Sequence, residues 1–181
     1  MGSLEKPAMT SAQGQPAVRV QPRPLTAAAF QPYGEVVSRP LTERRRYLSL
    51  AFDRSEAAGS ASLWISRATN LQALPLQLVV MERHPHSAQT FIPLERGRYL
   101  VAVCDALVDG APDPATCKVF IAGPDQAVTI ARNVWHHPMT VLDGPLEFAV
   151  AMTLKGGGDD VFVDLARGID VLATADQGLE S

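Results

Sequence analysis

The sequence has few cysteines, no excess of basic charge and no long apolar run. Cys104 and Cys117 are its only cysteines, and two thiols cannot form the disulfide framework of a small secreted protein. Lys and Arg number 16 against 19 Asp and Glu, so the net charge of -3 leaves no basic excess to bind nucleic acid or an anionic membrane. No apolar segment is long enough for a membrane span. These absences predict a cytoplasmic protein without nucleic-acid or membrane partners.

A sustained helical period is missing as well. The helix we expect is short, over Ala27–Phe30, because the Thr26 hydroxyl can cap its start and the residue before Pro32 is pushed out of helical geometry. The rest of the pattern consists of short β-rich runs, with Gly, Pro or Asp in nearly every gap. These runs cover residues 62–67, 76–82, 98–104, 117–121, 127–130, 147–153 and 161–163. Strands at this spacing predict an all-β sandwich or barrel, and the period alone does not choose between them.

The chain is predicted to form one domain between two polar ends. Its 181 residues fit the usual size of a single domain, and a hydrophobic content of 46% is enough for a core. Residues 1–21 contain Pro, Gly and Gln with few large apolar side chains, so we expect a disordered leader there. The barrel domain is expected over residues 22–170, and a C-terminal tail over residues 171–181.

The histidines fall in two short clusters that carry most of the chemical information in the chain. The first runs from Glu82 through His84 to His86 and is followed by Gln89; the second is His136 with His137, next to Trp135. Side chains two apart on a strand share a face, so Glu82 and His84 can converge on one point. A carboxylate and imidazoles inside a barrel suit a divalent metal ion. The plainer interpretation places the histidines at a strand end and in turns beside prolines.

The spacing of these residues resembles the cupin family, whose small β-barrels of the jelly-roll type hold metals through two sequence elements. The first element is His-x-His-x(3 or 4)-Glu, and this chain has Glu82-x-His84-x4-Gln89 in its place. The second is Pro-x-Gly-x-x-His, matched here only by its histidine, His136. The resemblance implies Glu82, His84, Gln89 and His136 as ligands of a divalent metal such as nickel, zinc or manganese. Neutral Gln is a weaker ligand than the carboxylate that it replaces.

A closer resemblance is to the ureidoglycolate lyase family of allantoin breakdown. The matching segments are residues 25–37 (LTAAAFQPYGEVV), 66–76 (SRATNLQALPL), 81–93 (MERHPHSAQTFIP) and 132–138 (RNVWHHP). They occur in the family's order and at similar separations. The resemblance implies a cupin-type fold, cleavage of ureidoglycolate to glyoxylate and urea, and a homodimer.

Two positions depart from the pattern of that family. Residues 40–45 stand where the family commonly has an Asn-rich turn with glycine, which leaves Arg46 and Tyr47 as the matching Arg-Tyr pair. Lys155 stands where the family has an arginine before a Gly-Gly turn. Lys offers a point charge where Arg offers a two-pronged clamp. A substrate contact at these positions would change which substrate the protein binds.

The cleavage reaction assigns expected roles to the candidate residues. The substrate hydroxyl must lose a proton, the leaving nitrogen must gain one, and the carboxylate must be held. His84 and His136 are expected in the catalytic centre, and His86 or His137 as the proton shuttle, because imidazole titrates near neutral pH. Arg132 and Lys155 are expected as carboxylate partners or as surface charges. Gln89 is expected both as a metal ligand and as a contact of the substrate.

Trp135 is expected to form a wall of the substrate pocket or of the core rather than to react.

Two other functions compete with the lyase. One is a non-catalytic cupin that binds a small molecule, and the other is a cupin enzyme acting on a related hydroxy acid or sugar acid, which the fold alone does not exclude.

Overall fold

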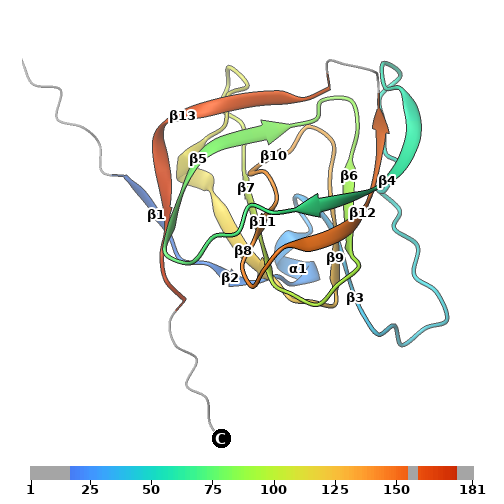
Figure 1. The fold of residues 1–181 in the computed structure, drawn as a ribbon. Helices are drawn as coiled ribbons and strands as arrows, with labels where there is room; N and C mark the ends of the chain where they lie inside the picture. Colours follow the sequence, from blue (N-terminus) through green and yellow to red (C-terminus); the bar gives the residue numbers. More distant parts are fainter. Residues whose placement is uncertain (1–16, 155–158, 175–181) are drawn as a thin grey trace, which may run out of the picture.

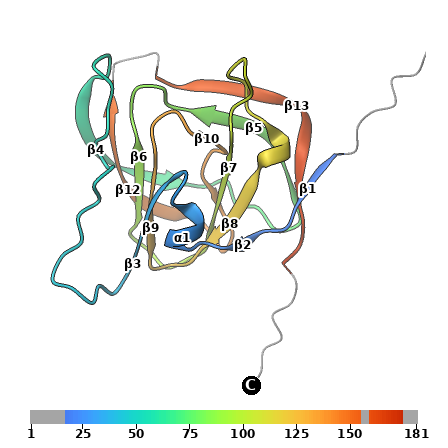
Figure 2. The same ribbon diagram turned by 180° about the vertical axis from the view of Figure 1, so that it is seen from behind.

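Two curled β-sheets form most of the molecule. The structure, a computed structural model, describes residues 17–154 and 159–174. The larger sheet has the strand order β1-β13-β5-β10-β7-β8-β2, with β11 paired to β7, and the smaller has the order β3-β9-β6-β12-β4. Together they give the all-β, cupin-like barrel that the sequence predicts. In Figures 1 and 2, β5 and β13 lie at the upper end of the barrel and the helix α1 at the lower end.

The elements of the described residues have the following bounds. The larger sheet contains β1 (Val18–Val20), β2 (Arg23–Pro24), β5 (Leu76–Arg83), β7 (Tyr99–Cys104), β8 (Lys118–Ala122), β10 (Trp135–His136), β11 (Thr140–Val141) and β13 (Val161–Val171). The smaller sheet contains β3 (Gly34–Ser38), β4 (Ser60–Ala68), β6 (Gln89–Pro93), β9 (Gln126–Ile130) and β12 (Leu146–Leu154). The helical elements are α1 (Ala27–Phe30) and the 3-10 turn η1 (Pro114–Thr116).

Two apolar cores lie on opposite faces of β7. Tyr99, Val101 and Val103 pack into a core that includes residues of both sheets. Leu100, Ala102 and Cys104 belong to a second core, formed by strands of the larger sheet as it curls over. Alternate side chains of a strand point to opposite faces, so a strand between two cores must be apolar throughout. This explains the unbroken hydrophobic run of β7, in which every residue is buried.

Most predicted elements are confirmed, with small changes at their ends. The helix covers Ala27–Phe30, and the Thr26 hydroxyl accepts a hydrogen bond from the Ala29 N–H. Each of the seven predicted β-rich runs overlaps a strand of the structure, and the last continues to Val171. The runs do not include β3, β6 and the strands of two or three residues.

The expected domain boundaries need correction at both ends. Val18–Val20, placed in the leader by the composition of residues 1–21, forms β1 and pairs in parallel with Ile169–Val171 of β13. Val18 and Val20 pack against the second core, and this burial offsets the ordering of a short segment. Val171, placed at the start of the tail, is fully buried. Of the two predicted ends, residues 1–16 and 175–181 lie outside the described residues.

No helix among the described residues is long and apolar enough to cross a membrane.

Candidate functional site

The two histidine clusters come together where β5 pairs with β10. His136 lies opposite Glu82 of β5 and opposite Val103 of β7 in the antiparallel register. Directly paired residues share a face of a sheet, so Glu82 and His136 point to the side of the first core. His84 follows the last residue of β5. Both imidazoles are buried, with 5% of His84 and 2% of His136 exposed.

Glu82, His84 and His136 can supply three ligand atoms that all lie within 4.8 Å of one another. The Nε2 atom of His136 is 3.3 Å from Oε1 of Glu82, and the centroids of the two imidazole rings are 5.2 Å apart. The spacing of Glu82 and His84 on one strand predicted that these two side chains converge. The resemblance to the cupin family added His136, although it lies 52 positions after His84 in the chain.

The hydrogen bonds of His136 indicate that a positive charge belongs between its ring and Glu82. Its Nδ1 atom is 2.9 Å from the carbonyl oxygen of Val134, which can only accept, so Nδ1 carries the proton. In the neutral ring, Nε2 is then a bare lone pair that faces the Glu82 carboxylate. This atom is buried and has no hydrogen-bond partner. Two facing acceptors require a cation between them, either a proton on the ring or a metal ion.

His84 has oxygen neighbours at both ring nitrogens. Its Nδ1 atom is 3.0 Å from Oδ1 of Asp160, and its Nε2 atom is 3.2 Å from Oε1 of Gln89. Nδ1 is buried and makes no hydrogen bond despite the nearby Asp160 carboxylate, whereas Nε2 is within hydrogen-bond distance of the amide oxygen of Gln89. Histidines that bind metals commonly give their other N–H to a carboxylate or a carbonyl. The donor set of the cluster therefore fits a divalent metal ion.

The charges in the cluster favour an ionised carboxylate beside a neutral imidazole. Burial raises the pKa of Glu82, but the interaction with His136 at 3.3 Å, together with the charges of His84 and His137, outweighs burial and holds that pKa below its ordinary value. Burial and the charge of His136 lower the pKa of His84, despite the nearby carboxylates. Ionised carboxylate and neutral imidazole are the protonation states that bind a metal.

Asp159 and Asp160 contact the segment that carries His84, and they are not among the site residues predicted from the sequence. Asp159 is buried and accepts hydrogen bonds from the N–H of His86, at 2.8 Å, and from the hydroxyl of Ser87. Asp160 is the carboxylate beside His84. The signal in the sequence was two consecutive acidic residues immediately before a predicted strand. Asp159 lies more than 70 positions after His86 in the chain, and no rule of sequence spacing connects residues so far apart.

The other two histidines lie beside the cluster rather than in it. The Nδ1 atom of His86 is 2.9 Å from the hydroxyl of Ser55. The Nδ1 atom of His137 is 2.9 Å from the carbonyl oxygen of Val80, and burial lowers the pKa of His137 despite this bond and the charge of Glu82. His137 is therefore neutral near pH 7 and keeps Nε2 as a proton acceptor.

Trp135 faces away from the cluster. It lies opposite Cys104 in the register and packs in the second core with only 1% of its surface exposed. Its indole N–H donates to the carbonyl of Gly110 at 3.0 Å, and the guanidinium carbon of Arg83 lies 4.5 Å from its ring centroid. Of the two expected positions, a wall of the substrate pocket or a wall of the core, Trp135 occupies the second, because neighbouring residues of β10 point to opposite faces.

The expected carboxylate partners differ in their positions. Arg132 is at the surface and pairs with Asp53 at 3.7 Å; the next residue, Asn133, donates its N–H to the carbonyl of His84. Arg132 is thus attached to the backbone that carries the cluster. Arg46 lies in an exposed segment, with Glu43 at 3.8 Å. Lys155 lies outside the described residues.

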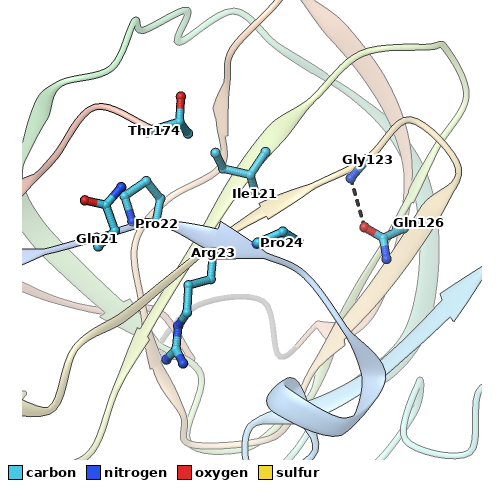
Figure 3. Close-up of a pocket in the computed structure, with 8 residues that line it drawn as sticks. All are labelled: Gln21, Pro22, Arg23, Pro24, Ile121, Gly123, Gln126 and Thr174. Atoms are coloured by element: carbon cyan, nitrogen blue, oxygen red, sulfur yellow. Dashed lines mark hydrogen bonds between the residues drawn. The ribbon is translucent and has the colours of Figure 1, made fainter. Parts of the chain in front are cut away.

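The two cysteines and the cavity beside β2 and β8 supply no nucleophile or acid–base group for a second site. Burial raises the pKa values of Cys104 and Cys117 to about 12, so neither thiol is a nucleophile near neutral pH. A cavity of about 570 Å³ lies beside β2 and β8, where Pro22, Pro24 and Ile121 form much of its wall (Figure 3). Arg23 is the sole ionisable residue that lines it. This cavity contains none of the predicted site residues.

The fold and the site define the class of the protein: a cupin-like barrel whose interior holds two imidazoles and one carboxylate. The comparisons with known proteins agree and are more specific. The family model described as Ureidoglycolate lyase matches residues 17–165. The ureidoglycolate lyase of Brucella anthropi is 39% identical over 138 residues, which cover 70% of this chain and 78% of that protein. The ureidoglycolate lyase of Brucella melitensis biotype 2 is 36% identical over 168 residues, which cover 84% and 95%.

The chain therefore belongs to the ureidoglycolate lyase family. A solved structure of a dTDP sugar isomerase from Desulfovibrio desulfuricans covers 74% of this chain and 82% of that chain, with a TM-score of 0.43 and 16% identity. That likeness is too distant to bear on the reaction.

Proposed function

We propose that the cluster of Glu82, His84 and His136 cleaves the C–N bond of ureidoglycolate to give glyoxylate and urea. The single observation that carries the proposal is the convergence of these three side chains, within 4.8 Å, in a chain of the ureidoglycolate lyase family. The buried and unpartnered Nε2 of His136 supports a reacting or ion-binding role, since an unsatisfied polar atom in a core is costly.

The chemistry requires three events at one carbon atom. The carbon of ureidoglycolate that reacts carries a carboxylate, a hydroxyl and the ureido nitrogen. The hydroxyl loses its proton as the carbonyl of glyoxylate forms, the C–N bond breaks, and its electron pair takes a proton on nitrogen to give urea. The protein must therefore accept one proton, deliver one proton and hold the carboxylate in place.

A divalent metal ion fits the ligands present. Glu82, His84 and His136 would hold it, and the amide oxygen of Gln89 would be a fourth ligand. When bound, such an ion would lower the pKa of the substrate hydroxyl and fix its orientation. Two imidazoles with oxygen donors suit nickel, zinc or manganese, which we propose as the candidates.

We assign the proton shuttle to His137 or His86. His137 is favoured by its lowered pKa and by its interaction with the charge of Glu82, which place a neutral base near the cluster. His86 would act through the hydroxyl of Ser55. Arg132, at the surface beside the backbone of His84, is our candidate for the substrate carboxylate, with Lys155 as the second.

We also propose a homodimer in the cytoplasm. The dimer is supported by the family resemblance and by the open edges of both sheets. The compartment is supported by two cysteines that are both free thiols, as is usual where the environment is reducing.

The experiment that tests this function measures both products. Purified protein with ureidoglycolate should release urea and glyoxylate in equal amounts, and the His136→Ala variant should not. Binding of ureidoglycolate without turnover would favour the non-catalytic cupin. Turnover of another hydroxy acid, with none of ureidoglycolate, would favour the related enzyme.

A further inference from the structure

The strand β4 ends the smaller sheet and leaves one long edge unpaired. All nine residues of Ser60–Ala68 pair with β12, and no strand among the described residues pairs with the other edge. Figures 1 and 2 both show β4 at the margin of the molecule. Soluble proteins protect such edges with proline, lysine, bulges or a cover. β4 has no proline and no lysine, and Arg67 is its single charged residue.

The middle of this edge strand is apolar and exposed. Leu63 and Ile65 lie two apart and on the same face, with 70% and 59% of their surfaces exposed. Trp64, between them, packs against the first core. An exposed, regular and apolar edge is a template for pairing with another strand.

The order of residues in β4 is nearly the same when read from either direction. With Trp64 at the centre, Leu63 balances Ile65 and Ser62 balances Ser66, while Arg67 falls opposite Ala61. In an antiparallel pair about a two-fold axis at Trp64, each copy therefore places an apolar side chain across from an apolar one. The two arginines do not meet, so no like charges are opposed. Self-pairing needs this symmetry, whereas pairing with an unrelated strand does not.

We propose that β4 pairs antiparallel with β4 of a second copy of the chain, with the two-fold axis at Trp64, and joins the two smaller sheets into one. The proposal rests on the homodimer proposed above and names its surface. It is independent of the cleavage reaction, because it is tested by mass rather than by turnover. The interface is isologous, with Leu63 against Ile65 in both directions.

The test replaces Leu63 and Ile65 by two acidic residues in one variant and by two basic residues in another, and then mixes the two variants. Wild-type protein at micromolar concentration should have twice the 19.4 kDa mass of the chain in light scattering. The variants Leu63→Glu/Ile65→Glu and Leu63→Lys/Ile65→Lys should each be monomers, because like charges then face each other, with self-association weakened at least about tenfold. A mixture of the two variants should regain the dimer mass.

A matched control separates this surface from a general effect of added charge. Leu107 and Val108 are also exposed, in the loop after β7, and the variant Leu107→Glu/Val108→Glu should keep the dimer. Circular dichroism checks that all variants are folded. Pairing with a second copy would protect the β4 amides at the free edge from hydrogen exchange. Their exchange should therefore be slower in concentrated than in dilute wild-type protein.

Each alternative result decides against the proposal. A monomeric wild type would overturn it without any variant. A dimer that persists in both charged variants, or a mixture that stays monomeric, would place the interface elsewhere. If urea release is absent but the mass results hold, the proposed reaction fails and the surface remains.

Discussion

The two residues of β10 both carry buried rings, but the rings differ in whether their polar atoms have hydrogen-bond partners. Trp135 has 1% of its surface exposed and His136 has 2%, yet they face opposite cores. The one polar atom of Trp135 donates to the carbonyl of Gly110, so the ring is fully satisfied. His136 instead directs an unpartnered Nε2 at the Glu82 carboxylate. The face of Trp135 is built for stability, and the face of His136 keeps an unsatisfied atom that stability alone does not explain.

The largest expected effect is on activity and comes from the His136 face. His136→Ala and His84→Ala should each lower kcat/KM for ureidoglycolate by at least about 100-fold, because each removes a group that acts on the reacting atoms. The fold should remain, since the vacated space lies beside polar groups. Initial rates of urea release measure the first effect, and circular dichroism the second. Near-normal rates in either folded variant would contradict the site.

A change on the Trp135 face should have the opposite result: a loss of stability with the activity retained. Trp135→Ala should lower the free energy of unfolding by about 3–5 kcal/mol, because it leaves a cavity in the second core. The protein that remains folded should keep its turnover per folded molecule. Urea denaturation with a parallel rate assay measures both quantities. A loss of turnover without a loss of stability would return Trp135 to the substrate site.

Asp160 tests whether the cluster is positioned from outside. Asp160→Asn should weaken metal binding by about 10- to 100-fold, because the carboxylate beside Nδ1 of His84 orients the ring and strengthens it as a ligand. Asp164→Asn, an exposed residue of β13, is the matched control and should leave binding unchanged. Competition with a coloured chelator gives the affinity. Equal affinities in the two variants would remove Asp160 from the site.

The smallest expected effect is the pH dependence of stability in metal-free protein. The folded pKa values of His84 and His137 lie below their ordinary values, so the unfolded chain binds more protons than the folded chain below about pH 6.5. The free energy of unfolding should therefore rise with pH up to about 6.5 and then level off. The substitution His137→Asn should reduce the slope of the free energy of unfolding against pH, below about pH 6.5, by up to about 1.4 kcal/mol per pH unit. An unchanged slope in denaturant titrations would show that His137 is not a buried base.

The comparison of the two faces also explains how far the sequence could predict the site. The spacing of Glu82 and His84 on a strand predicted their convergence, and resemblance to known families added His136 and Gln89. Which core Trp135 faces was not predictable, because the residues that it contacts, Gly110 and Arg83, lie far from it in the sequence. Asp159 and Asp160 were missed for the same reason: only the folded chain brings them to residues 84–87.

The fold was predictable where local patterns decide it. The longer strands and the helix at Ala27–Phe30 follow from alternation, turn residues and the Thr26 cap. The strand β1 was not predictable from its composition, because Val18–Val20 is ordered by burial against β13 rather than by its own propensity. The Glu82–His136 pair across β5 and β10 likewise depends on a two-residue strand that no period reveals.

The most direct test of the central claim pairs metal analysis with turnover in the same samples. Wild-type protein should contain a divalent metal ion, lose it and its urea release together on treatment with a chelator, and recover both when nickel, zinc or manganese is returned. The His136→Ala variant should bind the ion more weakly and stay inactive at every stage. Full turnover by wild-type protein stripped of metal, with the variant equally active, would contradict the account of a catalytic cluster at Glu82, His84 and His136.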